Sequence, residues 1–153
     1  MRILRRYFRL TAFERWIVIR CIAGLVITRV GLRVMGFGAW RKVVAALAPL
    51  NLVDGGGEGI LSFSGGIARM QAAAERHLFF RPSCLEHALV LWGLLRRYGV
   101  AADLRIGGRK ENGRFEAHAW VEIAGVPLDD EDGAHRNFAP FAGPVAVMES
   151  QTR

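Results

Sequence analysis

Cysteine and histidine are the residue types in this chain that could carry nucleophilic chemistry. The 153 residues include two cysteines, Cys21 and Cys84, and four histidines. A thiol becomes a strong nucleophile where a helix N-terminus or a nearby imidazole favours its thiolate. Cys21 lies in an apolar helical stretch and is expected to be core. Taken alone, Cys84 would also be expected to be a buried core residue. It directly follows Ser83, however, which is a preferred N-cap residue, and is therefore the candidate nucleophile.

The segment around Cys84 predicts a helix with well-marked ends. Ser83 and Glu86 have the spacing of a capping box, in which each side chain accepts a hydrogen bond from the other residue's backbone. Apolar residues then recur at helical spacing, and Gly99 is placed to end the helix after two arginines. Cys84 is thus expected to be the first helical residue. The charge of Glu86 opposes a thiolate there, so a histidine is needed as well.

His118 is the best placed of the four histidines. It lies in "FEAHAWVEI", where polar and apolar residues alternate as in a half-buried strand, on the polar face beside Trp120. His87 follows Cys84 by three residues and could reach it along the helix, but it has no obvious carboxylate to orient it. The other two histidines have no comparable context. The spacing therefore favours His118 as the general base.

A carboxylate partner for His118 is predicted from the β-hairpin that follows. A three-residue loop with Gly125 in its last position would place Asp130 directly opposite His118. A two-residue loop would place Glu131 there instead. Because glycine suits the last position of the longer loop, we predict Cys84, His118 and Asp130 as nucleophile, base and orienting carboxylate.

The elements preceding this segment are expected to be helices. Apolar periodicity over 11–50 predicts two of them, with a break in 31–38. The glycine-rich stretch 51–66 is expected to be a loop, and it lacks the Gly-Lys-Ser/Thr ending of a phosphate-binding loop. A short helix over 66–77 should lead to the Cys84 helix.

Strand-like alternation follows the Cys84 helix in three stretches: 101–107, 115–123 and 126–130. Helices followed by antiparallel strands predict an α+β fold. At this length we expect a single domain, 1–153, with an N-terminal helical part over 1–50 and a catalytic core over 66–135. The Cys84 helix should pack on the sheet.

The chain is basic, with a net charge of +7 when histidine is neutral. Its arginines recur singly and form no run interleaved with aromatic residues, so a nucleic-acid partner is not expected. A solvated helical face that keeps the protein soluble, or that docks an acidic peptide or protein, fits better, and contact with an anionic membrane is the weaker alternative. Two distant cysteines form neither a disulfide framework nor a metal-ligand pattern, which favours a reducing cytoplasm and no metal or other cofactor.

The N-terminal region has a basic start followed by an apolar run over 16–28. Arg20 interrupts this run, and no small-residue cleavage pattern follows it closely. The run is also shorter than the roughly 20 apolar residues that span a bilayer. Neither a signal peptide nor a transmembrane helix is expected.

Two blocks, "SCLEHALVLWGLLRRYGVAADLRIGG" and "FEAHAWVEIAGVPLDD", resemble the lasso-peptide biosynthesis B2 family of transglutaminase-like cysteine peptidases. The resemblance covers about residues 80–130. It implies a papain/transglutaminase-like core with Cys84 as nucleophile, His118 as general base and acid, and Asp130 as orienting carboxylate. The glutamine that papain-type peptidases place before the nucleophile is absent from "HLFFRP", which leaves the backbone N–H of Cys84 as oxyanion donor.

The same resemblance implies a leader peptidase that acts on a ribosomally made precursor peptide. Its expected partners are the precursor, a separate B1 leader-recognition protein and a macrolactam-forming lasso cyclase. We expect the N-terminal helices, including Arg29 and Arg33, to offer a surface for B1. Two alternatives remain open: acyl transfer to an amine by the same three residues, and a non-catalytic peptide-binding module.

Overall fold

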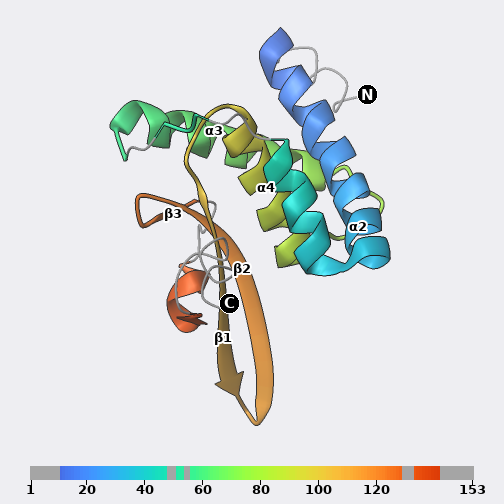
Figure 1. The fold of residues 1–153 in the computed structure, drawn as a ribbon, viewed down its shortest axis with the longest axis vertical. Coiled ribbons are helices and arrows are strands. Elements are labelled where there is room, and N and C mark those ends of the chain that lie inside the picture. The colour runs from blue at the N-terminus through green and yellow to red at the C-terminus, as the bar shows by residue number, and fades with distance from the viewer. Residues whose placement is uncertain (1–10, 48–50, 54–55, 129–132, 142–153) are drawn as a thin grey trace.

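The computed structural model describes residues 11–47, 51–53, 56–128 and 133–141. The helices are α2 (Ala12–Ala46), α3 (Glu58–Glu75), α4 (Cys84–Arg97) and the short 3₁₀ helix η1 (Ala134–Asn137). The strands are β1 (Asp103–Glu111), β2 (Arg114–Ile123), β3 (Val126–Leu128) and β4 (Ala139–Pro140). They form one antiparallel sheet in the order β3-β2-β1-β4. Helices α2, α3 and α4 gather beside one end of the long β1–β2 hairpin (Figure 1), which confirms the predicted α+β class.

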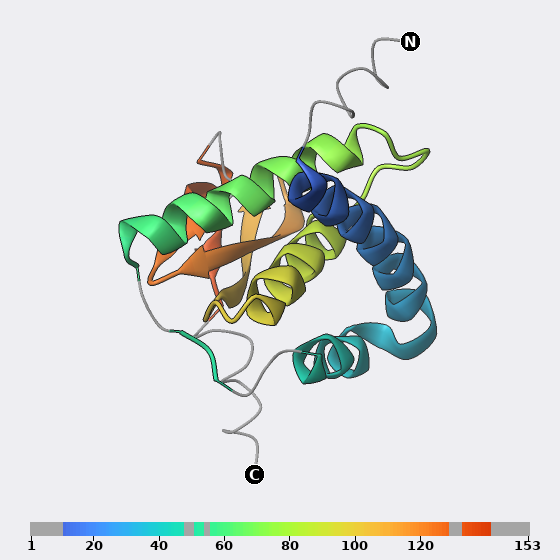
Figure 2. The ribbon, with the colours of Figure 1, turned by 90° about the horizontal axis from the view of Figure 1, so that it is seen from above.

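The predicted pair of N-terminal helices is confirmed: α2 consists of two helical limbs joined at a residue whose backbone is not helical. Its bend is at Gly36, which has a φ of 75°, within the predicted break. Positive φ values are costly for residues with a side chain, so glycine suits this position. After the bend the chain turns back on itself, and the Trp40 ring packs so closely on Gly31 that a Cβ there would lie 2.3 Å from it. Figure 2 shows the first limb of α2 beside α3 and α4, and the second limb lies against α4, where Val44 contacts Gly93.

The predicted loop over 51–66 is wrong in its second half, because α3 already begins at Glu58. Glycine lowers intrinsic helix propensity by about 1 kcal/mol per residue, which explains the prediction. Tertiary packing compensates: Ser64, Ile67 and Gln71 are fully buried on the inner face of α3. Burial of one face stabilises a helix that its local sequence alone would not form.

Helix α4 lies between α2 and the sheet and carries the centre of the core. Leu89, Leu91 and Leu95 are completely or almost completely buried. Its ends are those predicted: Ser83 is the N-cap, both hydrogen bonds of the capping box are formed, and Gly99 has a φ of 82° just beyond the helix. The prediction that Cys84 is the first helical residue is confirmed.

The β2–β3 turn differs from the predicted three-residue loop. Ile123 pairs with Val126, so the loop contains two residues, Ala124 and Gly125, with φ values of 49° and 77°. Two positive φ values are typical of a type I′ turn, which also favours glycine in its second position. The glycine signal was therefore common to both loop classes, and the predicted register is wrong by one residue.

Within the described residues, no helix is long and apolar enough to cross a membrane.

Candidate active site

A cleft of about 280 Å³ lies where α3, the start of α4 and β2 meet. Its lining includes Glu75, Cys84, His87, His118 and Trp120. The fold thus brings the predicted nucleophile and the predicted base, which come from separate elements, to one cavity. Among the described residues, no group of three His, Cys, Asp or Glu side chains is arranged to hold a metal ion.

Cys84 is half-buried at the N-terminus of α4 and faces β2. Its Sγ lies 4.0 Å from the carbonyl oxygen of Ala117, the residue before His118. The first N–H groups of a helix have no partner within the helix and create a positive potential that favours an anion. The thiol is therefore accessible, close to the base-bearing strand and at the favourable end of a helix.

His118 lies on β2 between two aromatic side chains, Trp120 of the same strand and Phe138, which follows η1. Its imidazole stacks on Trp120, with centroids 5.9 Å apart, and lies 5.1 Å from the Phe138 ring. Burial lowers the pKa of His118 below its ordinary value, and the neighbouring His135 and His87 act in the same direction. An imidazole with a lowered pKa is neutral at neutral pH, as a general base must be.

The charge of Glu86, which opposes a thiolate, is balanced by Arg29 of α2. The guanidinium contacts the carboxylate through Nε at 2.9 Å and Nη2 at 3.2 Å, and Nη2 also donates to the Arg81 carbonyl oxygen at 3.0 Å. Burial opposes ionisation of Glu86, but hydrogen bonds from Arg29 and from Ser83 outweigh it and lower the pKa. Arg29 thereby neutralises the charge of Glu86 in the capping box, and it also holds the backbone at Arg81, just before α4 begins.

Replacing Arg29 with alanine is expected to lower the free energy of unfolding by about 2 kcal/mol, or about 6 °C in Tm. The reason is that Glu86, whose side chain is only 9% exposed, would lose its counter-charge. Because 29% of the Arg29 side chain is exposed, the cost is smaller than for a fully buried pair. Thermal unfolding followed by circular dichroism measures it.

Arg33→Ala is the matched control, since Arg33 is exposed on the same helix. It should change the Tm by less than about 2 °C. Equal Tm values for the two variants would contradict the assigned role of Arg29.

The cleft contains an imidazole–carboxylate pair that the sequence did not predict. His87 Nδ1 hydrogen-bonds Glu75 Oε1, which also accepts from Gln71 Nε2 at 3.4 Å. Gln71 Nε2 donates in addition to the His87 carbonyl oxygen at 2.9 Å, so α3 fixes the first turn of α4 at both side chain and backbone. His87 therefore has the carboxylate partner that it lacked in the sequence. Glu75 was within the predicted helix 66–77, but no sequence spacing relates that helix to His87, so the pair depends on tertiary packing.

The third predicted site residue, Asp130, lies outside the described residues. The hairpin argument that selected it no longer holds, because the observed pairing of Ile123 with Val126 is offset by one residue from the predicted register. The assignment of Asp130 now depends only on the resemblance of "GVPLDD" to the end of the family motif.

Residues 58–143, more than half of the chain, match the sequence profile of the transglutaminase-like superfamily. The chain belongs to the transglutaminase-like superfamily. The matched region runs from the start of α3 beyond β4 and contains every described residue that lines the cleft. No curated protein and no solved structure matches the chain. A transglutaminase-like domain fits cysteine chemistry on acyl groups, as peptide hydrolysis or as acyl transfer.

Proposed function

We propose that this transglutaminase-like chain is a cytoplasmic cysteine endopeptidase that removes the leader from a lasso-peptide precursor. One observation carries the proposal: Cys84, at the N-terminus of α4, shares a cleft with His118. The two sequence blocks that resemble the B2 family contain both residues and supply the substrate class. A B1 protein that holds the leader and a lasso cyclase that closes the ring are the proposed partners.

The reaction proceeds through a thioester. His118 accepts the Sγ proton as the Cys84 sulfur attacks the scissile carbonyl carbon, and the imidazolium then protonates the departing amine. Water attacks the thioester with His118 again as base, which releases the leader carboxylate and restores the thiol. The backbone N–H of Cys84 is the proposed oxyanion donor, and Asp130 is the proposed orienting group for His118.

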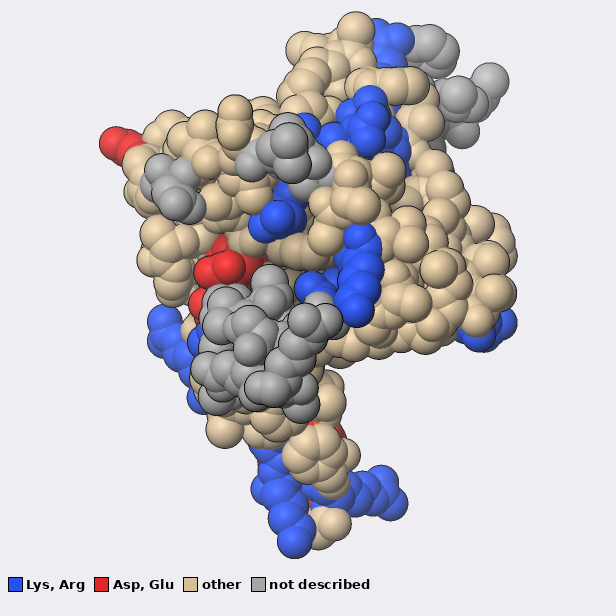
Figure 3. Space-filling view, in the orientation of Figure 1, with Lys and Arg blue, Asp and Glu red and all other residues tan. Residues whose placement is uncertain are grey.

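A transglutaminase-type transfer to an amine uses the same first step and differs only in the second nucleophile. The third candidate, a peptide-binding module without catalysis, requires no reactive thiol. The accessible position of Cys84 favours the two enzymes over the module. On the face that Figure 3 shows, lysines and arginines form separate groups rather than one continuous band, in keeping with the expectation from the sequence that the partner is a peptide or protein.

Mass spectrometry of the precursor after incubation with the protein and B1 separates the three functions. A peptidase gives two fragments, with a free carboxylate on the leader. A transferase gives a cross-linked product when an amine is added, and a binding module returns the precursor intact. The intact precursor, with correctly folded protein and bound B1, would overturn the proposal.

A further inference from the structure

A second hollow adjoins the Cys84 cleft along α3. Its volume is about 680 Å³, within the range of about 300–1,000 Å³ typical of ligand pockets. Ala72 and Glu75 line both cavities, so the two hollows share a wall. The rest of the larger one is formed by the segment 76–82, which connects α3 to the nucleophile helix. We call this hollow the 76–82 groove.

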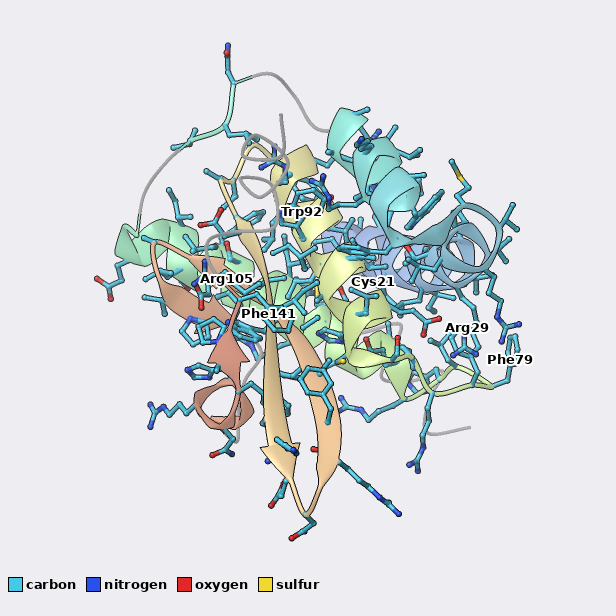
Figure 4. The ribbon with its side chains drawn as sticks, turned by 60° about the horizontal axis from the view of Figure 1, so that its bottom comes forward. Cys21, Arg29, Phe79, Trp92, Arg105 and Phe141 are labelled. Atoms are coloured by element: carbon cyan, nitrogen blue, oxygen red, sulfur yellow. The ribbon has the colours of Figure 1, made fainter. Side chains whose placement is uncertain are left out.

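The 76–82 groove contains an exposed aromatic side chain, Phe79, which packs against Phe80. Phe79 is 93% exposed, and its ring stands edge-on to Phe80 with centroids 5.2 Å apart. Phe80 in turn lies under the Arg29 guanidinium, 3.9 Å from its ring centroid. Figure 4 shows Phe79 beside Arg29 at the outer end of this connection. Aromatic side chains are enriched in the interfaces of proteins with their partners, and Phe79 is free to contact one.

The charge of the 76–82 groove is positive. Arg76 and Arg81 line it and are exposed, and neither side chain forms an ion pair or hydrogen bond with any residue that the structure describes. Its one carboxylate, Glu75, is engaged by His87. Guanidinium groups without an acidic neighbour attract carboxylates of a ligand.

We propose that the 76–82 groove binds the part of the peptide substrate next to the scissile bond, and that it selects an aromatic residue with an acidic neighbour. Phe79 supplies the apolar contact, and Arg76 and Arg81 supply the contact to the carboxylate. The shared wall with the Cys84 cleft argues for a peptide, because one extended chain can occupy both hollows. This inference rests on the proposed function, and it adds which residues the peptidase prefers next to the scissile bond.

Binding of three labelled probe peptides to the Cys84→Ala variant tests the preference. Each is a fluorescein-labelled ten-residue Gly/Ser peptide with Glu-Phe, Lys-Phe or Glu-Ala at its centre. Fluorescence anisotropy should show the Glu-Phe probe binding at least about fivefold more tightly than either of the others, with the difference from Lys-Phe decreasing as salt is added.

Variants in the Cys84→Ala background locate the binding site. Phe79→Ala and Arg81→Ala should each weaken binding of the Glu-Phe probe by about threefold or more. The matched controls are Phe115→Ala, an exposed aromatic residue of the β1–β2 hairpin, and Arg69→Ala, an exposed arginine of α3 outside the groove. Neither control should change the affinity.

Equal affinities for the three probes would overturn this inference. So would Phe79-dependent binding to vesicles with anionic lipid in place of peptide discrimination. Iodoacetamide labelling of Cys84 in the otherwise unchanged chain separates this failure from failure of the proposed function. Labelling without probe discrimination rejects only the substrate preference, whereas an unreactive Cys84 rejects the peptidase and leaves the binding result standing.

Discussion

Replacing Cys84 with alanine is expected to lower kcat/KM for leader hydrolysis by at least about 10⁴-fold. No other thiol lines the cleft, so the thioester cannot form. Alanine is a good helix former and Cys84 is only half-buried, so the fold should persist. The Tm should decrease by less than about 4 °C. The rate of fragment formation, measured by chromatography and mass spectrometry beside a thermal unfolding curve, separates lost chemistry from lost structure.

Cys21 is the matched control for this prediction. It is fully buried, and burial together with the charge of Glu75 raises the pKa of its thiol to about 12. Iodoacetamide near neutral pH should therefore add one carbamidomethyl group to the native protein, at Cys84, and a Cys21→Ala variant should keep its activity. Undiminished cleavage by Cys84→Ala, or preferential labelling of Cys21, would contradict the assignment of the nucleophile.

The start of α4 was predictable because its signals are local. Ser83 and Glu86 are three residues apart, and their hydrogen bonds depend on little beyond that spacing. The same spacing placed Cys84 at the helix N-terminus before any tertiary contact was known. The polar–apolar alternation that predicted β2 is local in the same sense, although the structure buries Ala119, Trp120 and Val121 in succession.

The contacts that complete the site were not predictable in this way, because they join distant segments. Arg29 on α2 neutralises Glu86, and Glu75 on α3 holds His87. Neither pair has a sequence spacing that indicates it. Each pair forms only because tertiary packing brings α2 and α3 against the start of α4.

The register of the β2–β3 hairpin was predicted wrongly by one residue, and this error decided which residue was predicted to face His118. Gly125 has a positive φ, as expected, but Ala124 also adopts one, and this makes the turn one residue shorter. An alanine in the left-handed region is uncommon, so no rule based on residue type would have chosen it. Since side chains alternate along a strand, a shift of one residue exchanges the two faces and removes the geometric argument for Asp130.

Replacing His118 with alanine is the second large effect, with an expected loss of about 10³-fold in kcat/KM. Because the pKa of His118 is lowered, the acid limb of the pH dependence of kcat/KM should lie below about 6.5 in the unmodified protein. Activity should rise with pH through this limb as the imidazole loses its proton. The limb should vanish in His118→Ala, and initial rates between pH 4.5 and 8 measure it.

His87→Ala provides the comparison, since His87 lines the same cleft and is oriented by Glu75. It should lower kcat/KM by less than about tenfold. The charge of His87 contributes to the lowered pKa of His118, so its removal should move the acid limb to higher pH. The opposite pattern, in which His87→Ala loses about 10³-fold and His118→Ala retains the acid limb, would assign the base to His87. Glu75, rather than a residue after β3, would then be the orienting carboxylate, and Glu75→Gln should reproduce the loss.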